Sequence, residues 1–137
     1  MATIDPYLTF DGTCAEAMRF YEKTLGAKLE AMMTWAEMPD AKSLPGAADR
    51  IMHASLTLEG GRALMAADSM PGQPHSPMSG FHLSLGYPSV AAAQKVFDAM
   101  SAGGQVTMPL QKTFWTEGFG MLVDRFGTPW MFNVAHG

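Results

Sequence analysis

The sequence predicts an α+β fold with two tandem modules, each built as one strand, one helix and three further strands (βαβββ). A repeat along the chain carries this prediction. Phe20 and Phe97 lie in the middle of two helical patterns and are 77 positions apart; Gly26 and Gly103, where these patterns end, have the same separation. The order of expected elements begins again after a linker at 69–80, which contains three prolines. An internal repeat of this kind predicts two copies of one structural unit.

The length and composition agree with one globular domain. The chain has 137 residues, of which 47% are hydrophobic and 16% charged, as is typical of a protein with a packed core. We assign 1–70 to the first βαβββ module and 79–137 to the second, and treat 1–137 as one structural domain. The net charge of −4 provides no basic surface, so neither nucleic acid nor an anionic membrane is expected as a partner.

The first module opens with a short alternating strand at 7–10, which stops at an Asp-Gly pair. A helix is expected next, because Thr13 and Glu16 have the spacing of a capping box, in which two side chains satisfy backbone N–H groups at the helix start. Gly26 is placed to end this helix, since glycine readily adopts the left-handed conformation that helix ends require.

Three further strands complete the first module. The segment 29–37 alternates so that one face of a strand carries only apolar side chains, namely Leu29, Ala31, Met33 and Trp35. The remaining segments are a loop at 38–48 and a hairpin with strands at 51–58 and 62–67.

The second module repeats this order with different residues. An alternating strand is expected at 82–85, and a helix follows from the apolar stripe of Val90, Ala93, Phe97 and Met100. The pair Gly103-Gly104 is expected to end the helix. The remaining strand candidates are 105–110, 121–124 and 130–134.

The cysteine content and the lack of a targeting signal limit the kinds of cysteine site and the cellular locations that we expect. The lone Cys14 rules out a disulfide framework and a cysteine-built zinc site. The N-terminal segment has no basic region followed by an apolar run, and no apolar stretch is long enough to cross a bilayer. A cytoplasmic location is therefore expected.

Four sequence blocks are distinctive. They are Tyr7-Leu-Thr-Phe-Asp-Gly, Asp49-Arg50-Ile51-Met52-His53-Ala54, Thr113-Phe114-Trp115 and Asp124-Arg125-Phe126-Gly127-Thr128-Pro129-Trp130. Together with the repeat, they make the chain resemble the vicinal oxygen chelate superfamily, which has the glyoxalase/bleomycin resistance/dioxygenase fold, and within it the PhnB-like branch. The resemblance covers nearly the whole chain.

The resemblance implies a cup formed by two curved mixed sheets, with the helices on the outer faces. The alternation of the two opening strands agrees with this arrangement. Leu8 and Leu83 should pack beneath the helices, while Tyr7 and His82 should point into the concavity.

The resemblance also raises the question of a metal. Glyoxalase-type members bind one divalent metal through four positions, two on the first strands of the modules and two on the last strands. In this chain the resemblance places Tyr7, His82, Met65 and Met131 there. Hard divalent ions prefer imidazole and carboxylate ligands, so we expect no metal and no other cofactor. Should a metal bind after all, a shifted register would offer His82 with Asp5 or Asp68.

The side chains expected to bind a ligand are mostly aromatic or sulfur-containing. They are Tyr7, Trp35, Met65, His82, Phe114, Trp115, Phe119 and Met131. Four of these aromatics, Trp35, Phe114, Trp115 and Phe119, are expected at sheet edges or in loops, where a homodimer seam is a second use for them. His53 is expected to be structural, on the polar side of its strand.

Two functions from different classes follow. The first is a PhnB-like protein that binds a small hydrophobic or aromatic molecule in its cavity without a catalytic metal. The alternative is a divalent-metal-dependent lyase, isomerase or dioxygenase of glyoxalase type that uses His82; it depends on analogy between folds. The sequence assigns no catalytic residue and leaves open whether the protein is an enzyme.

Overall fold

A computed structural model describes residues 2–37, 49–70 and 73–134. The contacts divide the chain into two compact units, 1–75 and 76–137. Each unit contains a four-stranded mixed sheet and one α-helix in the order βαβββ. The predicted α+β fold with two tandem modules is therefore confirmed.

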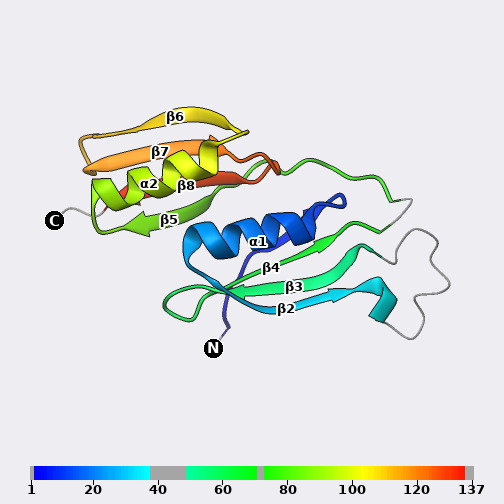
Figure 1. The fold of residues 1–137 in the computed structure, drawn as a ribbon. Coiled ribbons are helices and arrows are strands. Elements are labelled where there is room, and N and C mark those ends of the chain that lie inside the picture. Colours follow the sequence, from blue (N-terminus) through cyan, green and yellow to red (C-terminus); the bar gives the residue numbers. More distant parts are fainter. Residues whose placement is uncertain (1, 38–48, 71–72, 135–137) are drawn as a thin grey trace. The chain divides into compact units, whose positions relative to one another are not determined.

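The first unit has a sheet with α1 on one face (Figure 1). Its elements are β1 (Tyr7–Phe10), α1 (Cys14–Leu25), β2 (Lys28–Thr34), a 3₁₀ turn η1 (Trp35–Glu37), β3 (Ile51–Thr57) and β4 (Ala63–Asp68). The strand order is β1-β4-β3-β2, with β1 parallel to β4 and the other neighbours antiparallel. We call the face of this sheet that is turned away from α1 its helix-free face.

The second unit repeats this topology. Its elements are β5 (Leu83–Tyr87), α2 (Val90–Ser101), β6 (Gln105–Gln111), β7 (Gly118–Val123) and β8 (Pro129–Val134). The strand order is β5-β8-β7-β6, again with only the first pair parallel. The face turned away from α2 is the helix-free face of the second sheet. Neither of these two α-helices is long and apolar enough to cross a membrane.

Each core lies between a helix and one face of its sheet. In the first unit, Leu8 and Phe10 are buried with Tyr21 of α1, as the alternation of the first strand predicts. In the second unit, the rings of Phe97 on α2 and Phe132 on β8 meet edge to face, with centroids 5.1 Å apart. This packing leaves the other residues of each strand on the helix-free face.

The start of α1 differs from the prediction. The side chain of Thr13 makes no capping hydrogen bond. The Oδ1 atom of Asp68, at the end of β4, accepts hydrogen bonds from the backbone N–H groups of Gly12 (2.8 Å) and Cys14 (3.0 Å). A carboxylate that is distant in sequence therefore satisfies the helix start, which the local capping-box pattern could not reveal. The predicted end of the helix at Gly26 is confirmed by its left-handed φ of 68°.

The predicted single apolar face of the segment 29–37 is wrong. Leu29 pairs with the buried Leu56, whereas Ala31 pairs with Ser55 on the opposite face, because the register shifts between Leu29 and Ala31. The strand ends at Thr34, so Trp35 lies in η1. The predicted loop at 38–48 lies outside the described residues.

One strand of the second unit begins earlier than predicted. Strand β7 starts at Gly118 rather than at 121, and it is an inner strand of the sheet. Phe119, which was expected at an edge or in a loop, therefore lies within the sheet and pairs with Asn133 of β8.

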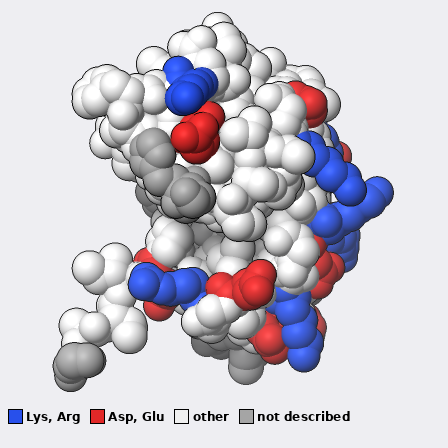
Figure 2. Space-filling model, turned by 90° about the vertical axis from the view of Figure 1, so that its left-hand side faces the viewer, with Lys and Arg blue, Asp and Glu red and all other residues white. Residues whose placement is uncertain are grey.

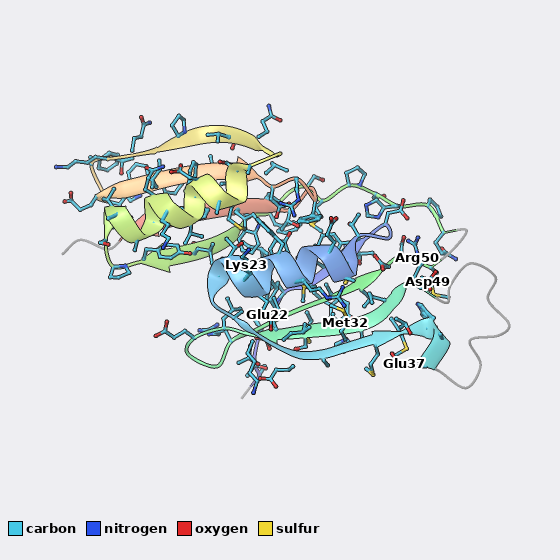
Figure 3. The ribbon with its side chains drawn as sticks, in the orientation of Figure 1. Glu22, Lys23, Met32, Glu37, Asp49 and Arg50 are labelled. Atoms are coloured by element: carbon cyan, nitrogen blue, oxygen red, sulfur yellow. The ribbon has the colours of Figure 1, made fainter. Side chains whose placement is uncertain are left out.

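Arg50 lies where β3 begins (Figure 3). Its side chain bonds to two other segments of the first unit. Its Nη2 atom donates to the Asp11 carboxylate at 2.8 Å, and its Nε atom donates to the Ser69 carbonyl at 2.8 Å. The bond from Arg50 lowers the pKa of the Asp11 carboxyl. Figure 2 shows basic and acidic side chains beside each other on one face of the molecule.

Candidate functional site

The register of the first sheet decides which side chains share its helix-free face. Tyr7 on β1 pairs with Met65 on β4, and Met65 pairs with Ser55 on β3, so these three form one row across the strands. His53 lies two positions before Ser55 on the same face and pairs with Met33 on β2. The face thus carries a phenol, an imidazole, a hydroxyl and two thioethers.

Tyr7 and His53 are joined by a hydrogen bond. The Tyr7 hydroxyl lies 3.0 Å from Nδ1 of His53, and the ring centroids are 5.7 Å apart. Half of the Tyr7 surface is exposed (50%). Partial burial raises the pKa of the Tyr7 phenol, and the nearby Cys14 adds to this rise, so the phenol keeps its proton at neutral pH.

The second sheet has an equivalent row. Ser84 on β5 pairs with Met131 on β8, and Met131 pairs with Met121 on β7. This row corresponds strand by strand to Tyr7, Met65 and Ser55 of the first sheet. The position that corresponds to His53 is held by Phe119, two residues before Met121.

This register corrects the predicted position of His82. Ser84, rather than His82, is equivalent to Tyr7, because Ser84 is the residue that pairs with Met131. Tyr7 and Ser84 are 77 positions apart, the same separation as Phe20 and Phe97. His82 lies immediately before β5 and is exposed. Its part in ligand binding stays a prediction.

The two carboxylates considered as alternative metal ligands are engaged in the first unit. Asp68 is buried, and besides the two bonds at the helix start its Oδ2 atom accepts the N–H of Ile51 at 2.8 Å. Asp5 accepts a bond from the N–H of Ala63 at 3.3 Å.

Burial, with a contribution from Asp68, raises the pKa of the Cys14 thiol to about 12, so no thiolate is available there at neutral pH.

The residues at the four positions do not fit a divalent metal. The first sheet has a phenol and a thioether at its two positions, Tyr7 and Met65, and the second sheet has a hydroxyl and a thioether, Ser84 and Met131. Such ions prefer imidazole and carboxylate ligands. Within the described ranges, no three His, Cys, Asp or Glu side chains gather closely enough to hold a metal ion.

Three aromatic side chains of the second unit form a cluster. The centroids of Phe114 and Trp115 are 4.8 Å apart, and those of Trp115 and Phe119 are 5.5 Å apart. Phe114 is 94% exposed and Trp115 49%. The buried Thr116 holds this segment, because its hydroxyl bonds to the carbonyl of Val134 and accepts the N–H of Gly118.

Trp35 is attached to the first sheet through its backbone. Its N–H donates to the carbonyl of Arg50 at 3.1 Å. Its indole Nε1 atom is buried and has no hydrogen-bond partner among the described residues. Trp35 follows Met33 by two positions, but it lies in η1 beyond the end of β2.

The structure brings some of the predicted ligand-binding residues together. Tyr7 is paired with Met65 in one sheet, and the aromatic cluster assembles in the other. The sequence-based prediction favoured a structural role for His53, although its position two residues from Ser55 on an alternating strand indicated the same face. It also missed Ser84 as the equivalent of Tyr7, although the 77-residue separation was the available signal.

The chain is similar to known proteins over nearly its full length. A family model for the Glyoxalase/Bleomycin resistance protein/Dioxygenase superfamily matches residues 3–132. Protein YjdN of Escherichia coli (strain K12) is 38% identical over 141 aligned positions, which cover 96% of this chain and 95% of that protein.

Two solved structures are similar as well. The crystal structure of protein PA1353 from Pseudomonas aeruginosa has a TM-score of 0.92 and 42% identity, and the match covers all of both chains. The PhnB protein from Bacillus cereus has a TM-score of 0.82 and 25% identity, covering 98% of this chain and 100% of that one.

Proposed function

This chain belongs to the Glyoxalase/Bleomycin resistance protein/Dioxygenase superfamily, in its PhnB-like branch, and we propose that it binds small aromatic or hydrophobic molecules without a catalytic metal. The observation that carries the proposal is the chemistry of the helix-free faces. They bear Met33 and Met65 in the first sheet, and Phe119, Met121 and Met131 in the second. Thioethers and aromatic rings pack well against planar apolar molecules.

The side chains at the candidate metal positions are the reason why the proposal includes no catalytic metal. The residues at the positions that hold a metal in glyoxalase-type members offer no imidazole and no carboxylate. The competing proposal, a metal-dependent lyase, isomerase or dioxygenase, would need His82 to be joined by at least two such ligands. Metal analysis of protein purified without a histidine tag separates the two proposals.

The name of the Bacillus cereus relative includes the words 3-demethylubiquinone-9 3-methyltransferase. Nucleotide-type cofactors bind at a glycine-rich turn between a strand and a helix. In this chain the connection into α1 is Asp11-Gly12-Thr13, and the connection into α2 is Pro88-Ser89. Neither turn is glycine-rich, so neither resembles a binding site for the cofactor of a methyltransferase. We therefore do not propose methyl transfer.

A thermal-shift measurement with 2-naphthol tests the proposed binding. A ligand that binds only the folded chain stabilises it by about 2.7 kcal/mol at a hundredfold excess over Kd, so the melting temperature should rise. EDTA should not change this rise. Replacing Met65→Glu should abolish it, because a carboxylate would be desolvated on the binding face. The matched control Lys95→Glu, on the exposed side of α2, should leave it intact.

Two results would count against the proposal. The first is that neither 2-naphthol nor indole nor naphthalene raises the melting temperature. The second is a rise that disappears when EDTA is added.

We also propose that the protein forms a homodimer through the aromatic cluster. Support comes from Phe114 and Trp115, since large exposed aromatic side chains are typical of contact surfaces between proteins. Sedimentation velocity should show a dimer for the natural chain and a monomer for Phe114→Ser. A monomer at micromolar concentration in the natural chain would contradict this proposal.

A further inference from the structure

We infer that Tyr7 and His53 form the polar contact for a hydroxyl group on an aromatic ligand, bound on the helix-free face of the first sheet. This inference rests on the proposed function and adds to it the chemical class of the ligand, a phenol. It concerns the first unit alone.

The geometry sets the two side chains beside each other on the same helix-free face. Tyr7 comes from the edge strand β1 and His53 from the inner strand β3, and their polar atoms meet across β4 at 3.0 Å. Among the described residues, neither side chain has another hydrogen-bond partner. The phenol is half exposed, so the pair is accessible to a small molecule.

The pair retains a hydrogen-bond donor whichever way its own bond runs. If the Tyr7 hydroxyl donates to Nδ1, the neutral imidazole of His53 carries its proton on Nε2. If Nδ1–H of His53 donates to the Tyr7 oxygen, the phenolic O–H is left free, because the phenol is protonated at neutral pH. A ligand oxygen can accept from either group, and a ligand hydroxyl can also donate to the remaining lone pair.

The neighbours of the pair favour a planar apolar body on that ligand. Met65 pairs with Tyr7 and Met33 pairs with His53, so a thioether stands beside each polar group. Contacts between a thioether sulfur and an aromatic ring are favourable. An aromatic ring with one hydroxyl group could therefore bond to the Tyr7–His53 pair while its ring packs against the two methionines.

The second sheet provides a built-in comparison. Its equivalent positions hold Ser84 and Phe119 in place of Tyr7 and His53, and the phenyl ring has no hydrogen-bonding group. Polar recognition is therefore assigned to the first sheet. Ser84→Ala is accordingly the matched control for Tyr7→Phe, since each removes one hydroxyl at the same register position.

The test compares two probes that differ in one group. Fluorescence titration gives the Kd of 2-naphthol and of 2-methylnaphthalene, in which a methyl group replaces the hydroxyl. We expect 2-naphthol to bind about tenfold more tightly, as one satisfied hydrogen bond allows. The double variants Tyr7→Phe/His53→Leu and Tyr7→Phe/His53→Phe leave neither polar group of the pair, so each should reduce this ratio to about one without weakening 2-methylnaphthalene, whereas Ser84→Ala should keep it.

The outcomes separate this inference from the proposed function. Equal binding of both probes by the natural chain, or an unchanged ratio in a folded double variant, overturns the inference and leaves aromatic binding in place. Absence of binding by both probes overturns the inference and the proposed function together. Circular dichroism shows which variants fold, and either one of the two double variants suffices for the comparison.

Discussion

Single buried carboxylates hold the irregular parts of both units. Asp68 bonds to three backbone N–H groups of the first unit. Asp124, after β7, accepts bonds from the N–H groups of Phe126 and Thr128 and from the indole of Trp130. Bonds of this kind to a charged acceptor are roughly twice as strong as neutral ones. These two aspartates are therefore part of the fold rather than of a metal site.

Replacing Asp68→Asn should lower the free energy of unfolding by about 2–4 kcal/mol. The amide NH₂ group of asparagine cannot accept a hydrogen bond, so it cannot replace a carboxylate oxygen that accepts from backbone N–H groups. Urea denaturation followed by circular dichroism measures this change. The control Asp98→Asn, an exposed residue on α2, should stay within about 0.5 kcal/mol of the natural chain. Equal stability of the two variants would show that Asp68 does not hold the start of α1.

At the scale of elements, the sequence predicted what depends on local pattern. The opening strand 7–10 is confirmed at both ends, and Gly26 ends α1 as predicted. Long-range contacts decided the rest. The helix start depends on Asp68, 54 residues beyond Cys14, and the register shift in β2 depends on its pairing with β3.

In the candidate site, too, local pattern predicted some features and long-range contacts determined the others. Alternation correctly placed Tyr7 opposite to the helix, but it could not distinguish His82 from Ser84, since residues two apart on a strand share a face. Only the pairing of Ser84 with Met131 resolves that choice. The bond between Tyr7 and His53 joins strands that are not adjacent in the sheet, and no local pattern encodes it.

Two strand glycines differ in the space around them, and this difference yields a prediction for the second sheet. A Cβ atom on Gly120 would lie 2.9 Å from both Leu110 Cα and Phe97 Cε2, whereas a Cβ on Gly86 would meet nothing within 4 Å. Gly120→Ala should therefore destabilise the protein by about 1–3 kcal/mol. Gly86→Ala should be neutral or slightly stabilising.

Urea midpoints of these two glycine variants provide the measurement. A Gly120→Ala variant as stable as Gly86→Ala would mean that β7 and α2 pack less closely than described.

At the scale of the whole molecule, two copies of one topology carry different chemistry. The rows on the helix-free faces share methionine at the last-strand position, Met65 and Met131. They differ at the neighbouring positions, where the first sheet has Tyr7 and His53 and the second has Ser84 and Phe119. A repeat that keeps its register while its side chains diverge is consistent with one polar and one apolar surface for ligands.

The Kd of 2-naphthol shows whether the protein binds its ligand without a metal. It is measured for protein stripped of metal with EDTA and dialysed, and again after separate addition of Zn²⁺, Ni²⁺, Mn²⁺ and Fe²⁺. We predict values that agree within about twofold, since the ligand is proposed to contact the helix-free faces without a metal. Binding that is absent from the stripped protein and restored by one of these ions would contradict it.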